Sequence, residues 1–445
     1  MSTSTLPAPR YQPNRLWVYL TCVYIVTWYL QLGNRIGLLG AIRFEFLLGA
    51  VLSLGAFSTY FSTPEKNSPL FGPVLFLLGV FTCYSLFSWD FSHSWTIYFD
   101  RVVKFAMLAV FLSVFVRTPW ALKMVVGAFL LAMLKLGQEG FVGWVTGGQM
   151  WQNQGVMRLH GSVPMYGHPN SFSGMAVGCL PFVYFLFPAV SRIWKAALLL
   201  LLLFCTIIII FTGSRTGYVA TIGLGLVFFS LSSGKAKWRY LILAGLIGVT
   251  ALVFLPDQYK ERFESIFTMK EKEGASAETR MEIIHDAVEV YLAHPLGVGV
   301  GAFPLVRMEM FGRVQDTHNL YLELLTNLGP VGVIAFFMVI YQIFKVNRQV
   351  QKRLLGCRSP DEQFMMGVSK AVVAFIWARL FLGLFGMDTY EIYWWFAIGL
   401  SGAMWTMVQQ GATDKTVSTR TGLSHSGDQK ETAYDKQVGL RLKRR

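Results

Sequence analysis

The chain has 445 residues, of which 54% are hydrophobic and only 14% are charged, and its net charge at pH 7 is +14. This composition is the profile of a polytopic membrane protein. A strongly positive charge also occurs in nucleic-acid-binding proteins, but here the basic residues are spread through short loops and a tail, without a basic groove motif. We therefore expect no nucleic-acid partner and interpret the charge as an orientation signal for membrane insertion.

Apolar runs long enough to cross a bilayer, which takes about 20 residues, recur along the chain. The first run follows Arg10 and Arg15 and has no small-residue cleavage pattern after it, so we interpret it as a retained span and not as a signal peptide. The second run contains the charged residues Arg43 and Glu45. Together the runs predict twelve transmembrane helices, at 16–32, 36–61, 70–88, 98–116, 120–145, 168–188, 193–211, 216–231, 239–256, 319–344, 368–386 and 390–409.

The twelve spans predict an all-α membrane protein. Lysine and arginine gather in alternate loops, which predicts that both termini lie in the cytoplasm. One long outer loop joins the ninth and tenth spans. We accordingly divide the chain into nine transmembrane helices at 1–256, an outer loop with site residues at 257–318, three transmembrane helices at 319–410 and a basic, disordered cytoplasmic tail at 411–445.

Within the outer loop, the stretch ETRMEIIHDAVEVYLAHP at 278–295 predicts an amphipathic helix. Met281, Ile284, Val288 and Tyr291 recur at helical spacing and define its apolar face. A proline follows the predicted end of the helix. The next stretch, GVGVGAF, is expected to supply flexible backbone.

The stretch RVQDTHNLYLELLTNLGP at 313–330 leads from the outer loop into the tenth span. At ~100° per residue, Asn319, Glu323 and Thr326 fall within a narrow arc of one helix face. A lipid-facing helix would not tolerate this polar arc. We therefore expect it to face protein or a water-filled cavity.

Three arginines, Arg158, Arg215 and Arg280, are expected on the outer side. An arginine near membrane depth costs at least ~2.5–3.5 kcal/mol on insertion scales and therefore usually has a partner. One interpretation is that each snorkels to lipid headgroups or pairs with an acidic residue such as Glu278. The other is a phosphate clamp, since a planar guanidinium engages phosphate oxygens bidentately, and the Gly and Ser residues of FTGSRTG would let backbone donors approach the same anion.

His318 lies at the start of the tenth span, where it is either an interfacial hydrogen-bonding residue or a proton acceptor. Asp316, two residues earlier, and the polar arc behind it favour the second interpretation. Because the usual pKa of histidine lies near neutral pH, His318 is suited to accept and release a proton.

His160, His168 and Asn170 accompany a Gly/Pro-rich loop and are plausible pocket residues. Metal-binding motifs of the HExxH or DxD type are absent from the sequence. Glu271 and Glu273 lie in MKEKEG, a solvated charge run. We therefore expect no metal site and no cofactor.

Three motifs together resemble the O-antigen ligase/polymerase superfamily: SRTG between two spans, Arg280 followed by the P.G.G.GAF pattern in the outer loop, and THNLYLELLTNLGPVG opening the tenth span. The twelve-span layout looks most like the O-antigen ligases of that superfamily. The resemblance implies a fold similar to a GT-C-type glycosyltransferase, in the bacterial inner membrane, with a periplasmic active site. One departure is the stretch RMEII, which begins at Arg280 and occurs where relatives often carry a tryptophan.

The resemblance also implies the substrates and the roles of the site residues. The donor would be an undecaprenyl-pyrophosphate-linked glycan and the acceptor lipid A–core. His318 matches the periplasmic histidine of the family, Arg215 and Arg280 match its basic residues, and Arg158 is a looser match. Asn319, Tyr321 and Glu323 are expected to support the site.

The implied chemistry is metal-independent, inverting glycosyl transfer. The arginines would neutralise the pyrophosphate, while His318 would accept the proton of the acceptor hydroxyl and Asp316 would orient the histidine. Two alternatives remain open. One is an O-antigen polymerase or protein O-oligosaccharyltransferase of the same superfamily, which differs in acceptor. The other is a lipid-linked glycan transporter, which should show paired discontinuous helices that we do not see in the sequence.

Overall fold

The chain folds as an all-α, multi-pass membrane protein, as its sequence predicts. The computed structural model describes residues 14–62, 68–153, 155–231, 234, 237–238, 256–268, 276–357, 359–386 and 389–409. Within these residues, six helices are long and apolar enough to cross a membrane, and two further apolar helices are shorter. The predicted ninth span and the tail lie outside the described residues almost entirely, so the count of twelve spans stays a prediction.

The elements follow one another in the order α1 (Arg15–Leu30), α2 (Leu32–Arg35), α3 (Gly37–Ala41), α4 (Phe44–Ser62), α5 (Phe71–Leu86), α6 (Phe91–Ile97), the π-helix η1 (Tyr98–Val103), α7 (Lys104–Phe115), α8 (Pro119–Thr146), β1 (Met150–Asn153), β2 (Val156–Leu159), η2 (Pro164–Tyr166), α9 (Pro169–Leu186), η3 (Phe187–Ala189), α10 (Arg192–Phe211), α11 (Arg215–Leu231), α13 (Asp257–Thr268), α14 (Ser276–Ala293), α15 (Phe303–Phe311), α16 (Leu320–Leu354) and α17 (Pro360–Leu382). Residues 392–409 form the last described helix.

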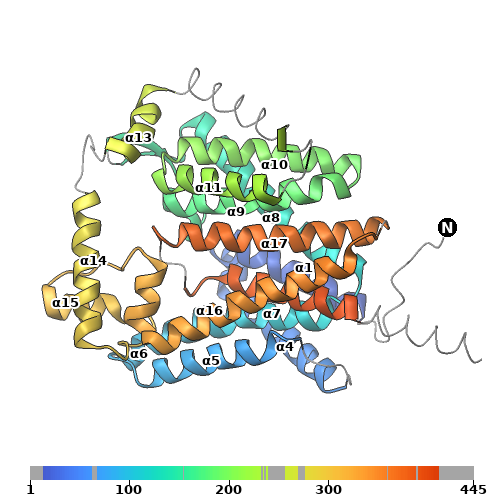
Figure 1. Cartoon of the computed structure of the whole chain (residues 1–445), viewed down its shortest axis with the longest axis horizontal. Helices are drawn as coiled ribbons and strands as arrows, with labels where there is room; N and C mark the ends of the chain where they lie inside the picture. Colours follow the sequence, from blue (N-terminus) through green and yellow to red (C-terminus); the bar gives the residue numbers. More distant parts are fainter. Residues whose placement is uncertain are drawn as a thin grey trace, which may run out of the picture.

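The long helices lie side by side in a bundle, and α13, α14 and α15 gather at one end of it (Figure 1). Helix α9 packs against both α10 and α17. The ring of Phe182 in α9 lies 5.3 Å from that of Phe129 and 5.8 Å from that of Phe375, measured between centroids. A β-carbon on Gly367 of α17 would lie only 2.7 Å from the carbonyl oxygen of Phe185, so glycine allows the two backbones to approach closely.

The second predicted span, 36–61, is wrong in its first part. Residues 32–41 form the short helices α2 and α3, and the helix long enough to cross a membrane begins only at Phe44. Arg43 separates the two parts with a left-handed backbone conformation (φ 50°), which a β-carbon disfavours and which breaks the helix. This break leaves Arg43 outside the membrane-crossing helix.

Residues 276–293 form the predicted helix α14, but its predicted apolar face is wrong. Met281 and Val288 are exposed, whereas Ile283, Ala287 and Val290 are buried. The buried face packs against α15 and α16. The prediction was wrong because apolar residues lie on both faces of the helix. Contacts with the neighbouring helices determine which face is buried.

The glycine-rich stretch after α14 is held in place by hydrogen bonds, contrary to the expectation of flexible backbone. The N–H groups of Val298 and Gly299 donate to the carbonyl oxygens of Thr326 and Asn327 in α16, both at 2.9 Å. These carbonyls are available because α16 is kinked at Gly329 and Pro330 has no N–H to bond to Thr326. The glycines therefore permit a close backbone crossing and do not serve as a hinge.

Substitution of Gly329 tests this crossing. Gly329 has φ 59° and ψ −169°, and a β-carbon there would lie 2.5 Å from the carbonyl oxygen of Leu296. We expect Gly329→Ala to destabilise the protein by at least ~2 kcal/mol, through backbone strain and overlap together. Gly312→Ala is the control, since Gly312 also has a positive φ (70°) but no atom within 4 Å of an added β-carbon.

The measurement is the thermal unfolding temperature of the purified full chain. Gly312→Ala should cost only the backbone strain, about 1–2 kcal/mol, and Gly329→Ala should lower the Tm by several degrees more. Equal decreases for the two variants would mean that the backbone crossing contributes nothing to stability.

Candidate functional site

A cavity of about 1040 Å³ is lined by residues of α13 and α14 at the end of the bundle. It brings together four predicted site residues, Arg158, Arg215, Arg280 and His318. Among the described residues, its wall carries eight basic side chains and two carboxylates, namely Arg43, Arg101, Lys104, Arg158, Arg215, Arg262, Arg280 and Arg379 against Asp100 and Glu391. A concave surface of this charge attracts anions.

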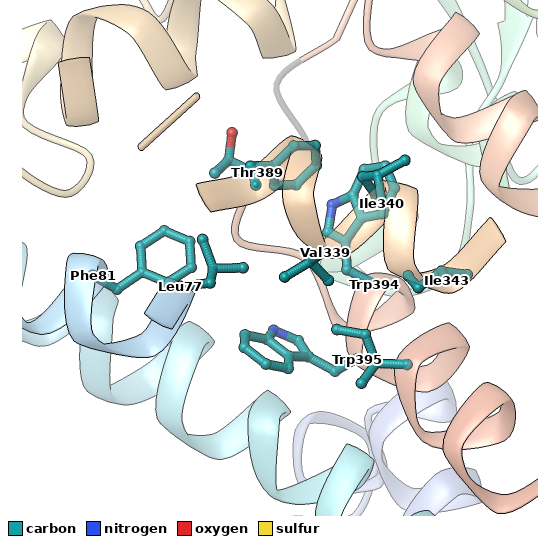
Figure 2. Close-up of a pocket in the computed structure, with 10 residues that line it drawn as sticks. Leu77, Phe81, Val339, Ile340, Ile343, Thr389, Trp394 and Trp395 are labelled. Carbon is teal, nitrogen blue, oxygen red and sulfur yellow. The ribbon is translucent and has the colours of Figure 1, made fainter. Parts of the chain in front are cut away.

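A second, apolar cavity lies between α5, α16 and the last helix. Leu77, Ile340 and Trp395 are among the side chains around it (Figure 2). It measures about 10 Å³, close to the smallest volume that holds one water molecule. We interpret it as a packing gap and assign it no ligand.

Arg158 reaches the large cavity from a β-hairpin, in which β2 pairs with β1 and Arg158 faces Trp151. Its Nε donates to the carbonyl oxygen of Thr212 at 2.8 Å, and its Nη2 donates to Oδ1 of Asn170 at 2.7 Å. The side chain is only 2% exposed. Both acceptors are uncharged, so they orient the guanidinium without neutralising it.

Arg215 occupies the first position of α11, directly after the turn that ends α10. Gly213 in this turn has φ 55°, in the left-handed region that favours glycine. The N–H of Gly213 donates to the carbonyl oxygen of Ile210 at 3.1 Å, so this donor serves the turn and is not directed to the cavity, contrary to expectation. The hydroxyl of Ser214 accepts from the N–H of Gly217 at 3.2 Å and caps α11.

Two further arginines reach the cavity from α13 and α14. Arg262 of α13 is buried, and its Nε donates to the carbonyl oxygen of Gly213 at 3.3 Å. Arg280 of α14 lies with its guanidinium carbon 6.0 Å from the ring centroid of Phe385. The sequence analysis missed Arg262, although it shares a helix face with Tyr259, and an arginine on the buried face of an amphipathic helix is a usable signal.

The arginines lie close enough for their charges to interact. Burial, followed by the charge of Arg262, lowers the pKa of Arg158 to about 10, and the charges of Arg215 and Arg280 act in the same direction. The electrostatic interaction with Tyr218 raises the pKa of Arg158. Because like charges are held together here, an anion that binds among them relieves their mutual repulsion.

His318 lies in the loop between α15 and α16, and its side chain lines the cavity. Within the described residues, three non-glycine residues have a positive φ, namely Gln31, Arg43 and His318, and all three line this cavity. Such backbone strain persists only where the surrounding structure holds it, and it clusters at functional sites.

The electrostatic environment keeps the imidazole of His318 neutral. Desolvation lowers its pKa, and the positive charges of Arg280 and Arg307 lower it further. A neutral imidazole at neutral pH has a free nitrogen lone pair. His318 can therefore accept a proton from a group in the cavity.

A cluster of ion pairs stabilises the segment that precedes His318. Arg307 of α15 is fully buried, and its Nε donates to Oδ2 of Asp286 at 2.8 Å. Arg313 donates to the same oxygen at 3.1 Å and lies 2.9 Å from the carboxylate of Glu282. Asp286 and Glu282 belong to α14, so the cluster joins α14 to the loop that carries His318.

The same cluster relates two candidate site residues to each other. Arg280 and Asp286 lie on one helix, α14. Nη1 of Arg307 is 3.5 Å from the carbonyl oxygen of Gln315, three residues before His318. This buried contact therefore links the helix that carries Arg280 to the segment that precedes His318.

Asp316 does not contact His318. In the described part of the chain, no hydrogen bond or ion pair joins the two side chains, so the predicted orienting role of Asp316 has no contact to support it. Burial raises the pKa of the Asp316 carboxyl, whereas the charges of Arg101 and His93 lower it. The carboxyl group therefore lies nearer to Arg101 and His93.

Asn319 and Tyr321 hold α16 in position and do not line the cavity. The side-chain oxygen of Asn319 accepts from the N–H of Tyr321 at 2.9 Å and caps the helix. Its Nδ2 donates to the carbonyl oxygen of Leu384 at 3.1 Å, and the hydroxyl of Tyr321 donates to that of Leu380 at 2.8 Å. Both residues therefore attach α16 to the end of α17 and the residues after it.

Glu323 and Thr326 face protein, which is one of the two environments predicted for the polar arc. Glu323 is 5% exposed and accepts from the hydroxyl of Thr389 at 2.7 Å. The hydroxyl of Thr326 donates to the carbonyl oxygen of Leu322 at 2.8 Å. Neither residue lines the cavity, so their part is structural in this conformation.

His168 and Asn170 line the cavity, and His160 does not. The Nδ1 of His168 accepts from the N–H of Asn170 at 3.2 Å and caps α9. Burial, followed by the charge of Arg158, lowers the pKa of His168 to about 4. His168 is therefore a second neutral imidazole beside the arginines.

Within the described residues, no group of three His, Cys, Asp or Glu side chains is placed to hold a metal ion. Glu271 and Glu273 lie outside the described residues. A metal-free site stays a prediction.

Residues 198–337 match the family model described as O-antigen ligase. The matched segment contains Arg215, Arg262, Arg280 and His318, and the resemblance found in the sequence is thereby confirmed. No curated protein matches the chain.

The buried ion pair beside the cavity can be tested by Asp286→Asn. This change leaves Arg307 with only the half-exposed carboxylate of Glu282, 3.8 Å away, and removal of one partner from a buried pair costs about 3–5 kcal/mol. We expect a large decrease in the thermal unfolding temperature. Glu282→Gln is the control, because the Glu282 side chain is 47% exposed and should contribute about 1 kcal/mol or less. Comparable decreases for both variants would show that burial of the pair is not what stabilises this region.

Proposed function

Because residues 198–337 match the family model described as O-antigen ligase, we propose that the chain transfers a glycan from undecaprenyl pyrophosphate to lipid A–core during lipopolysaccharide biosynthesis. The observation that supports this proposal most is the convergence of Arg158, Arg215, Arg262 and Arg280 with His318 on one cavity. In our proposal the cavity faces the periplasm and both termini lie in the cytoplasm, as the lysine and arginine distribution predicts.

The arginines bind the pyrophosphate of the donor. A pyrophosphate is already a good leaving group, so cleavage of the anomeric bond needs neutralisation of negative charge more than it needs an acid. Guanidinium groups engage two oxygens at once and stay protonated at any working pH. Arginines therefore supply, without a metal ion, the positive charge that the leaving group requires.

His318 acts as the general base toward the acceptor. The acceptor hydroxyl oxygen attacks the anomeric carbon, its proton passes to the free nitrogen of His318, and the bond from the anomeric carbon to the pyrophosphate oxygen breaks with its electron pair on the leaving group. Attack from the face opposite the pyrophosphate inverts the anomeric centre. The proton then leaves His318 to water, and undecaprenyl pyrophosphate is released.

The test is transfer by the purified full chain in liposomes, supplied with the lipid-linked glycan and a choice of acceptors. We expect His318→Ala to lower the turnover by about 100-fold or more, since a general base contributes about 10²–10⁴-fold. His285→Ala is the control, because His285 is 72% exposed and does not line the cavity.

Near-normal turnover of His318→Ala would contradict the assignment of the base. The acceptor panel tests the activity itself. If the glycan is added to a second lipid-linked glycan and not to lipid A–core, the chain is a polymerase. If labelled donor crosses the membrane without bond cleavage, it is a transporter.

The pH dependence of transfer should report the lowered pKa of His318. Since the protonated imidazole cannot accept a proton, kcat/KM should be constant at neutral pH and fall on the acid side only at a pH below the usual histidine pKa of about 6.5. Arg280→Gln removes a charge that lowers the pKa of His318, so its acid limb should move to higher pH. Arg215→Gln is the matched control and should reduce the rate without moving the limb. If the acid limb of Arg280→Gln lies at the same pH as that of the wild type, the limb reports the titration of a group other than His318.

A further inference from the structure

A buried arginine lies on the α17 side of the cavity. Arg379 belongs to the last turn of α17, is 6% exposed and lines the cavity. Its guanidinium carbon is 3.7 Å from the ring centroid of Tyr393 and 5.2 Å from that of Phe375. An arginine within an apolar helix is costly and is a functional-site candidate for that reason. It was missed in the sequence, although it is a charged residue inside the predicted span 368–386.

Helix α9 leaves space for this guanidinium. A β-carbon on Gly178 would lie 2.9 Å from Nη2 of Arg379, and one on Gly174 would lie 3.7 Å from Nη1. Gly174 itself lines the cavity. Two glycines on one helix face therefore form a cradle in which the planar group lies against the helix with Tyr393 also in contact.

The same face of α9 relates Arg379 to Arg158. Asn170, which binds Arg158, precedes Gly174 by four residues, and Gly178 follows after four more. Residues four apart lie on one helix face and are separated by about 6 Å along the axis. Arg158 and Arg379 are thus placed at successive turns of α9, with Arg379 farther from the end of the bundle that carries α13 and α14.

We propose that Arg379 forms a deep phosphate subsite, which binds the lipid-proximal phosphate of a polyprenyl diphosphate while the outer arginines bind the sugar-proximal phosphate. A diphosphate presents two anionic groups in series, and guanidinium groups one helical turn apart can engage one each. The lipid tail lies on the membrane side, so the deeper arginine meets the phosphate next to the lipid. This subsite rests on the proposed donor.

The test compares the binding of undecaprenyl diphosphate and undecaprenyl monophosphate to the purified full chain. The wild type should bind the diphosphate more tightly. Arg379→Gln should weaken the binding of both lipids by about 10- to 100-fold, the range for a hydrogen bond to a charged group, because each lipid carries the lipid-proximal phosphate. Arg215→Gln should weaken diphosphate binding and change monophosphate binding by less than about threefold. Arg379→Lys should recover only part of the lost affinity, since lysine lacks the planar fork.

Matched variants separate binding from folding. Gly178→Ala keeps the arginine but displaces it, so it should also weaken the binding of both lipids. Gly79→Ala in α5 has no atom within 4 Å of the added carbon and should change neither affinity. Asn347→Ala removes a fully buried amide that donates to the hydroxyl of Ser401 at 2.8 Å and does not line the cavity, so it should lower the Tm and keep both affinities.

The outcomes distinguish the subsite from the proposed function. If Arg379→Gln and Gly178→Ala bind both lipids as the wild type does, Arg379 is a structural residue and the subsite is wrong. The subsite is equally wrong if Arg379→Gln weakens diphosphate binding alone and leaves monophosphate binding unchanged. If the wild type binds neither lipid, the proposed donor itself is wrong.

Discussion

The structure depends on holding several guanidinium groups near one another without removing their charge. Arg158 is bound by a carbonyl oxygen of Thr212 and by the amide of Asn170, and Arg262 by the carbonyl oxygen of Gly213. The neutral acceptors of Arg158 orient its side chain and leave its positive charge to attract a ligand. Arg307 shows the opposite case, because the carboxylate of Asp286 binds it directly and it takes no part in the cavity wall. Arg158 thus presents its charge to the cavity, whereas the charge of Arg307 is compensated by a carboxylate.

Contacts among α14, α15 and α16 hold the wall of the cavity in place at one end of the bundle. The glycine-rich stretch after α14 crosses α16 at its kink, where Pro330 leaves the carbonyl of Thr326 free to accept from Val298. The Arg307–Asp286 pair then joins α14 to the loop before His318. These contacts hold the strained backbone of His318 at the cavity. They also bring Arg307, which does not line the cavity, close enough for its charge to lower the pKa of the imidazole.

Helix α9 contacts two parts of the cavity, one beside Arg158 and one beside Arg379. At its start, His168 caps the helix and Asn170 accepts from Arg158, and one to two turns later its glycines lie against Arg379. An α-helix is stiff and has a constant rise, so it sets the separation between bound groups more reliably than a loop would. The same glycines also let α9 pack closely on α17, so one feature of the sequence serves packing and the site together.

By itself, the sequence determined the multi-pass helical class and the motifs around Arg215, Arg280 and His318, because run length and short motifs are local properties that can be read without knowing the neighbours. Local pattern failed where a partner from elsewhere in the chain decides the outcome. The buried face of α14 carries Asp286 because Arg307 arrives from α15, and periodicity contains no information about that pair. Only the tertiary structure decided which arginines share a cavity, since their segments are far apart in the chain and are brought together by helix packing.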